Sequence, residues 1–282
     1  MPQLENKIAL ITGAGSGIGR ALALQLAERG CVLAISDVNA DGLVETATRL
    51  RAAGGACSTH LVDVADRAAV EAFAAAVADE HGAVHLVVNN AGVTLVDRAE
   101  HVTYEDLDWI MNINFWGVVY GTKAFLPYLR QVDEAHIVNV SSLFGLVAMP
   151  LQSSYSASKF AVRGFTEGLK MELAGSHIGV SCVHPGGIKT SIGKNSRVGE
   201  DALSIPKEQL VADFEKAAAT TPEQAAGAII RGIEKNKRRV LIGRDARIVD
   251  IVARLFPGGY EKILGVEKKV LAAAKEVNAS KH

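Results

Sequence analysis

A glycine-rich turn between a short apolar run and a helical stretch constrains this chain more than any other feature. Residues 7–12 read Lys-Ile-Ala-Leu-Ile-Thr, the pattern of a buried parallel strand, and the stretch after the turn is amphipathic. The spacing is Thr-Gly-x-x-x-Gly-x-Gly on Thr12, Gly13, Gly17 and Gly19. Because glycines have no Cβ, a pyrophosphate can approach the backbone N–H groups at the N-terminus of the helix. The pattern predicts a dinucleotide-binding unit rather than a flexible surface turn.

A second apolar run, residues 32–36, ends at Asp37, which lies 24 residues after Gly13. An acidic side chain near this distance accepts hydrogen bonds from a ribose 2′-hydroxyl and repels a 2′-phosphate. No arginine or lysine stands at position 38 or within the glycine turn. Asp37 therefore favours NAD over NADP, although an ordinary aspartate in a turn after a strand is the simpler interpretation.

Apolar runs and amphipathic stretches alternate along most of the chain. Further strands are predicted at residues 57–62, 84–88, 136–140, 179–183 and 239–242, and helices at 41–53, 66–80, 104–111, 112–129, 155–174 and 222–236. This alternation predicts an α/β fold, a single doubly wound Rossmann domain whose parallel sheet of about seven strands has helices on both faces. We assign residues 1–243 to the dinucleotide-binding catalytic domain, with a lid at about 188–221, and residues 244–282 to a C-terminal helical extension of it.

Composition excludes several classes of protein. Lys and Arg total 30 against 31 Asp and Glu, so no global field would attract nucleic acid or an anionic membrane. Cys31, Cys57 and Cys182 are far apart and are expected to be buried reduced thiols of a cytoplasmic protein. His81 and His85 are separated by a helix end, and no metal site is predicted. No apolar run is long enough to span a bilayer.

Tyr155 and Lys159 are four residues apart and share one face of a predicted helix. A cation beside the tyrosine would favour the phenolate and bring the pKa of the phenol towards that of a working acid or base. A Tyr-x-x-x-Lys pair alone is usually a solvated surface pair. The glycine turn and a Ser-Ser pair upstream, ending at Ser142, make the catalytic interpretation stronger.

Together these motifs closely resemble the short-chain dehydrogenase/reductase family. The matching residues run in family order from 7 to 190, and the helix and strand pattern continues to about 243. They are the glycine turn, Asp63, Asn89-Asn90-Ala91-Gly92, Asn114, Ser142, Tyr155-x-x-x-Lys159, and Pro185-Gly186 with Thr190. The resemblance says little about the residues that follow.

The resemblance implies roles for four catalytic residues. Tyr155 would be the base in alcohol oxidation and the acid in ketone reduction, and Lys159 would lower the pKa of Tyr155 and bind the nicotinamide ribose. Ser142 would hold the substrate oxygen, and Asn114 a water that links Lys159 to solvent. The implied cofactor-binding residues are Gly13, Ser16, Gly17, Ile18, Gly19, Asp37, Asp63, Val64, Asn90, Ala91, Gly92, Tyr155, Lys159, Pro185, Gly186, Ile188 and Thr190.

The leading hypothesis is an NAD-dependent oxidoreductase that interconverts a hydrophobic secondary alcohol and its ketone. Apolar side chains near the motifs favour a hydrophobic substrate, although ordinary packing explains them equally well; they are Leu95, Leu143, Phe144, Leu146, Val147 and Met149. The alternatives are an NADPH-dependent ketone or acyl-carrier reductase, a sugar-nucleotide epimerase or dehydratase, and a non-catalytic dinucleotide-sensing regulator.

Two further expectations concern surfaces. Residues 245–256 form an amphipathic stretch with Ile248, Ile251, Val252 and Leu255 on one face, and a second helix is expected at 267–278. Packing of that face on the same subunit or its neighbour is favoured over contact with a membrane surface. The resemblance favours a homodimer or homotetramer, with the helices at 112–129 and 153–174 as the interface.

Overall fold

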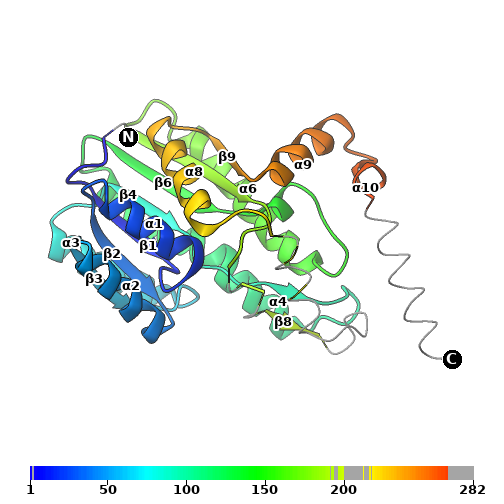
Figure 1. Cartoon of the computed structure of the whole chain (residues 1–282), viewed down its shortest axis with the longest axis horizontal. Coiled ribbons are helices and arrows are strands. Elements are labelled where there is room, and N and C mark those ends of the chain that lie inside the picture. Colours follow the sequence, from blue (N-terminus) through cyan, green and yellow to red (C-terminus); the bar gives the residue numbers. More distant parts are fainter. Residues whose placement is uncertain are drawn as a thin grey trace.

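Seven parallel strands form the central sheet of the computed structural model, which describes residues 1, 3–190, 192–193, 196–199, 212, 216 and 218–265 (Figure 1). The strands are β1 (Ile8–Thr12), β2 (Val32–Asp37), β3 (Cys57–Leu61), β4 (Leu86–Asn89), β6 (Ala135–Val140), β7 (Ile178–Pro185) and β9 (Arg239–Ile242). Their order is β3-β2-β1-β4-β6-β7-β9, so the direction of winding reverses between β1 and β4. Ligands bind beyond the carboxyl ends of the strands at such a point. The predicted doubly wound sheet is confirmed.

Helices cover both faces of the sheet. On one side lie α1 (Gly17–Ala27), α2 (Ala40–Ala52) and α8 (Pro222–Glu234), and on the other α3 (Arg67–His81), α5 (Gly117–Leu129) and α6 (Ser153–Glu172). The remaining α-helices in the described ranges are α4 (Tyr104–Met111), α9 (Arg244–Leu255) and α10 (Tyr260–Ile263).

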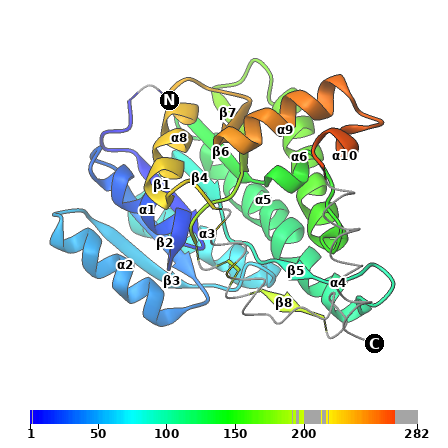
Figure 2. The same cartoon turned by 45° about the vertical axis from the view of Figure 1, so that its right-hand side comes forward.

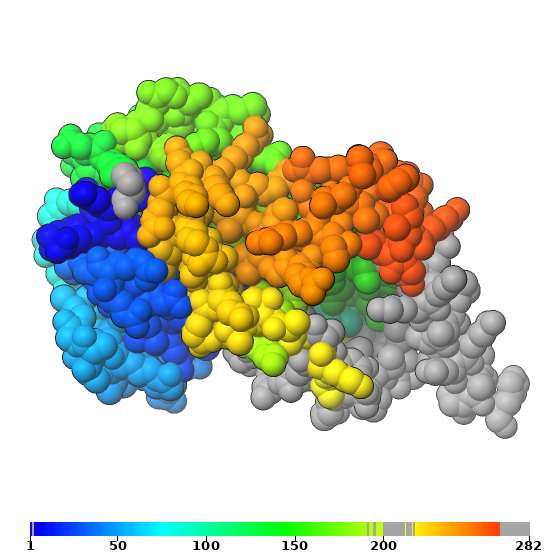
Figure 3. Space-filling view, turned by 45° about the horizontal axis from the view of Figure 1, so that its top comes forward, coloured from blue at the N-terminus to red at the C-terminus, as the bar shows by residue number. Residues whose placement is uncertain are grey.

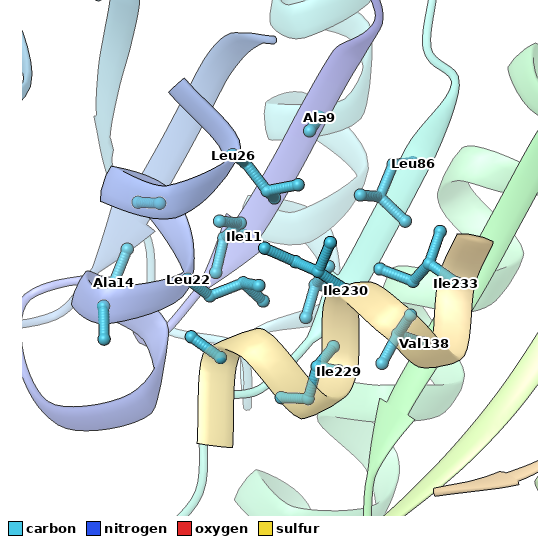
Figure 4. Close-up of a cluster of buried hydrophobic side chains, with 14 of the residues drawn as sticks. Ala9, Ile11, Ala14, Leu22, Leu26, Leu86, Val138, Ile229, Ile230 and Ile233 are labelled. Carbon is cyan, nitrogen blue, oxygen red and sulfur yellow. The ribbon is translucent and has the colours of Figure 1, made fainter. Parts of the chain in front are cut away.

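Alternation along the strands builds two hydrophobic cores. In β1, Ala9 and Ile11 belong to the core under α1 and α8, whereas Leu10 belongs to the core under α3 and α5. This follows from the period of two in a strand, because successive side chains point to opposite faces. Figure 4 shows the first core, where Leu22 of α1 and Ile230 of α8 meet above the sheet.

Short polar side chains fix where several helices begin. Asn39 accepts a hydrogen bond from Gly42 N at 3.0 Å ahead of α2, and Asp66 accepts one from Ala68 N at 2.8 Å ahead of α3. Thr221 and Gln224 form a capping box at the start of α8. These caps place the helix starts within a residue or so of the predicted ones.

Two local features differ from the sequence prediction. The helix expected over 112–129 begins as a π-helix, Asn112–Trp116, before α5. A second parallel sheet, not predicted, pairs β5 (Leu95–Val96) with β8 (Arg197–Val198), which Figure 2 shows below α5. Arg197 also pairs with Asp106 at 2.6 Å and lies 3.9 Å from the ring centroid of Trp109. Isolated strands of two residues carry no periodicity, so the sequence could not indicate them.

The C-terminal extension departs from expectation in how α9 faces the protein. Ala246 and Val249 are buried, but Ile248, Ile251 and Leu255 are exposed. That apolar face therefore does not pack on the same subunit within the described residues, and the other half of the expectation, packing on a neighbouring subunit, stays a prediction. The helix expected at 267–278 and most of the lid expected at 188–221 lie outside the described residues. Within the described ranges, none of the helices is long and apolar enough to cross a bilayer.

The three cysteines of the described chain form no disulfide. Cys31 and Cys182 are buried and Cys57 is half-buried, and all three are free thiols. Burial raises the pKa of Cys31 to about 11 and that of Cys182 to about 12, so both are protonated at neutral pH. Across the described part of the chain, no group of three His, Cys, Asp or Glu side chains could hold a metal ion.

Candidate active site

The glycine turn after β1 is shaped so that side chains are excluded from it. Gly13 and Gly17 have φ values of 66° and 52°, a region that L side chains rarely adopt. A Cβ on Gly19 would lie 2.2 Å from the carbonyl oxygen of Gly13. The turn therefore needs glycine at these three positions, for backbone conformation at two of them and for close packing at the third.

The Asn90-Ala91 segment after β4 braces this turn. The backbone N–H groups of Asn90 and Ala91 both donate to Thr12 Oγ1 at 3.1 Å. Asn90 Nδ2 donates to the carbonyl oxygens of Thr12 at 2.9 Å and Gly13 at 3.1 Å. Motifs that are about eighty residues apart in the sequence are thus joined at the point where the winding of the sheet reverses.

Asp37 lies at the carboxyl end of β2, against the glycine turn. Its carboxylate accepts hydrogen bonds from Gly15 N at 2.8 Å and Asn39 N at 2.9 Å. A basic side chain that the sequence reasoning missed lies nearby, because Arg20 of α1 donates to the carbonyl of Gly15. Arg20 is paired with Glu45 at 2.8 Å. The Arg20 guanidinium therefore brings a positive charge close to the turn, but the Glu45 carboxylate balances that charge.

The Pro185-Gly186 loop after β7 comes back to the same turn. A Cβ on Gly17 would lie 3.1 Å from Thr190 Cγ2, so Thr190 contacts the glycine turn. Ile188 is buried and pairs with Thr220 in an isolated bridge. Gly187 N donates to Asp245 Oδ2 at 2.7 Å, and Asp245 is the second residue of α9. The C-terminal extension thus holds the loop, a connection that no sequence signal indicated.

The other predicted cofactor residues differ in their exposure. Asp63 is exposed and accepts from Ala65 N at 2.9 Å, whereas Val64 is buried. A Cβ on Gly117 would lie 2.9 Å from Val64 Cγ2, so Val64 packs on the start of α5. Ser16 precedes α1, and Ile18 packs partly against the core. Val64 and Ile18 therefore contribute to packing, in addition to the cofactor contacts predicted for them.

Tyr155 and Lys159 lie on the buried side of α6, and Ser142 lies at the end of β6. Their exposed fractions are 8% for Tyr155, 3% for Lys159 and 9% for Ser142. Lys159 Nζ is 5.8 Å from the centroid of the Tyr155 ring and donates to the Val140 carbonyl at 3.2 Å. A hydrogen bond joins Tyr155 to Ser142. The three predicted catalytic side chains are therefore brought together away from solvent.

Burial dominates the titration of this cluster. It raises the pKa of Tyr155 above its ordinary value, and the hydrogen bond with Ser142 opposes this shift. It also lowers the pKa of Lys159 to about 8. The direction for Tyr155 is opposite to the one predicted from the sequence, because the loss of water around the phenolate outweighs the hydrogen bond with Ser142. In this structure Tyr155 is a neutral phenol at pH 7.

Asn114 is the third residue of the π-helix and is fully buried. Its Oδ1 accepts from Val93 N at 2.8 Å, and its Nδ2 donates to Val93 O at 2.9 Å and to Ser158 Oγ at 3.0 Å. Both hydrogens of the Asn114 amide are therefore already donated. A water that links Lys159 to solvent, as predicted, could only donate a hydrogen bond to Asn114 Oδ1. A Cβ on Gly92 would lie 3.1 Å from both Asn114 Oδ1 and Lys159 Nζ, so Gly92 covers the two side chains.

His184 supports Ser142 from behind and was not singled out from the sequence. Its Nδ1 lies 3.0 Å from the Ser142 carbonyl oxygen, and since a carbonyl only accepts, Nδ1 carries the proton. Burial lowers the pKa of His184 to about 4, so the ring is neutral at pH 7. A histidine before a Pro-Gly pair gives no sequence signal for this contact, because it depends on the pairing of β6 with β7.

Apolar side chains pack around Tyr155 near the N-terminus of α6. Tyr155 shares a hydrophobic cluster with Leu95 and Ile110, and Phe144 makes an edge-to-face contact with its ring at 6.0 Å between centroids. Leu146 and Val147, expected at the substrate site, are buried in the protein at 7% and 2% exposure. These two side chains serve packing, whereas Leu95 and Phe144 lie next to the reactive group.

The arrangement fits a dinucleotide. The turn is a cradle that Cβ atoms would fill, and it stands at the N-terminus of α1, where backbone N–H groups favour phosphate. Asp37 lies at one side of the cradle and Thr190 at another. The loop that contains Gly92 runs from Asn90 beside this cradle to the Lys159 ammonium group.

Comparison with known proteins agrees with this arrangement. A family model described as short chain dehydrogenase matches residues 7–201. SadH of Mycobacterium tuberculosis, named as an oxidoreductase, is 47% identical over 276 residues, covering 95% of this chain and 98% of SadH. A 3-ketodihydrosphingosine reductase of Bacteroides thetaiotaomicron is 35% identical over 274 residues, covering 96% of this chain and 93% of that protein. A short-chain dehydrogenase/reductase of Burkholderia phymatum, solved in complex with NAD, superposes with a TM-score of 0.85 at 31% identity, covering 93% of this chain and 96% of that one.

Proposed function

The chain belongs to the short-chain dehydrogenase family and is an oxidoreductase of that family, and from this we propose that it interconverts a hydrophobic secondary alcohol and its ketone with NAD. The observation that carries the proposal is the meeting of Tyr155, Lys159 and Ser142 at a buried point reached by the loop that braces the glycine turn. A sensor that only bound the dinucleotide would not need this set.

The chain's own residues account for the proton transfer. Bound NAD or NADH supplies the hydride acceptor or donor. In ketone reduction, the neutral phenol of Tyr155 gives its proton to the substrate oxygen, and Ser142 donates a hydrogen bond to the same oxygen. Lys159, protonated below pH 8, stabilises the phenolate that Tyr155 becomes. In alcohol oxidation the same groups act in reverse, and Tyr155 Oη receives the hydroxyl proton.

We assign NAD as the cofactor because of Asp37. Its carboxylate is held beside the glycine turn by two backbone N–H groups, where it would accept from ribose hydroxyls and repel a 2′-phosphate. Arg20 supports the second candidate, an NADPH-dependent ketone or acyl-carrier reductase, because its guanidinium also lies at the turn. Its pairing with Glu45 at 2.8 Å reduces the charge available to a phosphate.

The substrate class follows from the surroundings of Tyr155. Half-buried apolar side chains pack in the same cluster as Tyr155; they are Val93, Val102, Trp109, Met111 and Phe144. An apolar wall favours a long-chain or polycyclic alcohol over a sugar or a small acid. The relative from Bacteroides thetaiotaomicron, whose name refers to a long-chain ketone, fits the same class.

The expected assembly is a homodimer or homotetramer through α5 and α6. Trp116 at the start of α5 is 42% exposed and Phe160 of α6 is 40% exposed, which suits a contact between subunits. Light scattering on the full chain tests this, and a monomeric mass would contradict it.

The experiment that tests the function is turnover of a panel of secondary alcohols, from small aliphatic ones to steroids, with NAD and separately with NADP. We expect NADH formation with the bulky alcohols. Tyr155→Phe should lower kcat at least a thousandfold, whereas Tyr104→Phe, which alters a tyrosine that is 87% exposed, should leave it unchanged. Equal use of NADP would refute the role of Asp37. Turnover by Tyr155→Phe at the wild-type rate would refute the mechanism.

A further inference from the structure

The outward side of the C-terminal extension is an exposed apolar surface. Five of the twelve exposed large hydrophobic side chains in the described part of the chain lie on α9, on α10 or in the turn between them. We call them the α9–α10 face: Ile248, Ile251, Leu255, Phe256 and Ile263, with exposures of 54%, 57%, 67%, 51% and 52%. In Figure 3 the orange atoms of α9 and α10 lie at the surface beside α8. A cluster of exposed apolar side chains on one segment of the chain is typical of a site of interaction.

The α9 helix is apolar on two opposite sides. Ala246 and Val249 face the protein, while Ile248, Ile251 and Leu255 recur at intervals of three and four residues on the other side. A surface helix of a globular protein needs only one apolar side, the one that faces the core. The second stripe therefore requires an apolar environment outside the fold described here.

The acidic and basic residues of α9 also differ in what they contact. Its two acids are engaged by the protein, because Asp245 accepts from Gly187 N and Asp250 is buried and pairs with Arg239 at 2.7 Å. Arg254 is exposed and pairs with Asp250 at 3.0 Å. Arg244 and Arg247 are exposed beside the apolar stripe, and Lys262 follows on α10, next to Glu261. An apolar stripe with exposed arginines beside it is typical of helices that lie in the interface of an anionic bilayer.

The α9–α10 face is joined to the catalytic loop. Ala148 N donates to Tyr260 Oη at 3.2 Å, so α10 rests on the segment between Ser142 and Tyr155. Figures 1 and 2 show α9 and α10 on the same side of the molecule as α6. A partner bound to this face would therefore sit next to the segment that carries the catalytic residues.

We infer that the α9–α10 face docks on the surface of an anionic lipid bilayer and that the protein takes its hydrophobic alcohol or ketone from that surface. The second clause rests on the proposed function, whereas the docking itself does not. A twofold contact between copies would bring the arginines of both molecules together, which costs free energy. Residues 266–282 carry four lysines and two glutamates, so this end of the chain also favours an anionic partner.

The test is sedimentation of the full chain with vesicles of phosphatidylcholine, alone or mixed with phosphatidylglycerol. We expect binding to the mixed vesicles, reduced at least tenfold in Ile251→Glu/Leu255→Glu. The matched control is Val44→Glu on α2, where Val44 is 65% exposed and lies outside the face, and it should bind like the wild type. Arg244→Gln/Arg247→Gln should weaken binding about 30-fold at low salt, because each basic residue contributes about 1 kcal/mol near such a surface.

Three outcomes would overturn the inference. The first is that Ile251→Glu/Leu255→Glu binds the mixed vesicles as well as Val44→Glu does, and the second is that the wild type binds neither kind of vesicle. The third is that Ile251→Glu/Leu255→Glu lowers the particle mass in light scattering, which would mean that a second copy covers the face. Turnover of a short, water-soluble secondary alcohol without vesicles reports separately on the proposed function. Stimulation of long-chain alcohol turnover by mixed vesicles would support both.

Discussion

Replacing Lys159 by methionine should make the protein more stable at neutral pH while abolishing its activity. Lys159 is 3% exposed, and burial lowers its pKa from 10.5 to about 8. This difference corresponds to about 3 kcal/mol by which the native state is destabilised when the ammonium is charged. The substitution also removes the hydrogen bond to the Val140 carbonyl, worth about 1 kcal/mol. Methionine fills the space with an apolar chain of similar length, so a net gain of about 2 kcal/mol is expected.

The gain should depend on pH in a defined direction. Below pH 8 the lysine is charged in both the native and the unfolded state, and the whole destabilisation is present. Between about pH 8 and 10.5 the native state releases the proton while the unfolded state keeps it, so the wild type becomes more stable as pH rises. Above that range the destabilisation disappears. The advantage of Lys159→Met should therefore fall close to zero near pH 9.5.

Urea unfolding followed by circular dichroism, at pH 7 and at pH 9.5, measures both quantities. Lys123→Met is the matched control, because Lys123 is an exposed lysine on α5 and its removal should change the free energy of unfolding by less than about 0.5 kcal/mol at either pH. The argument that the buried charge of Lys159 destabilises the native state would be refuted by either of two results. One is a Lys159→Met variant no more stable than the wild type at pH 7, and the other is a gain in stability that is the same at pH 9.5.

Three other predictions follow from the site. Gly19→Ala should abolish NAD binding in calorimetry, because its Cβ would lie 2.2 Å from Gly13 O, whereas Gly164→Ala, with nothing within 4 Å, should bind normally. Asp245→Ala should raise KM for NAD about tenfold with little change in kcat, since Gly187 N loses a charged acceptor at 2.7 Å; an unchanged KM would contradict this role. Ketone reduction should slow as pH rises above about 8, where Lys159 loses its proton, and a flat rate to pH 9.5 would contradict that assignment.

The sheet, the glycine turn and the Tyr155–Lys159 pair could be predicted from the sequence because they depend on short-range patterns. Apolar runs of five or six residues between glycines and amphipathic stretches gave the strands, and the parallel order then brought their carboxyl ends to one edge. Tyr155 and Lys159 could be paired from their spacing alone. Gly13 and Gly17 could be assigned to the turn because positive φ is the usual reason for glycine at such a place.

The remaining features depend on tertiary contacts that leave no local pattern. Asp245 follows the last strand of the sheet, but its bond to Gly187 exists only because β9 pairs with β7. The raised pKa of Tyr155 reflects how completely the fold buries it, which spacing does not reveal. The π-helix at 112–116 depends on the buried side chain of Asn114, which binds the backbone of Val93 across the site.

The order of strands in the sheet also bears on how the chain folds as it is made. β2 pairs with β1 and β3 with β2, and on the other side β4 pairs with β1, β6 with β4, β7 with β6 and β9 with β7. Each strand that leaves the ribosome thus finds its neighbour already synthesised. Because domains form from the N-terminus during translation, the sheet can grow outwards from β1 in both directions without any strand waiting for a later one. The growing edge at β1, β4, β6 and β7 is unpaired only until the next strand arrives, which limits the time in which nascent chains could pair there, whereas β3 and β9 remain the two edges of the finished sheet.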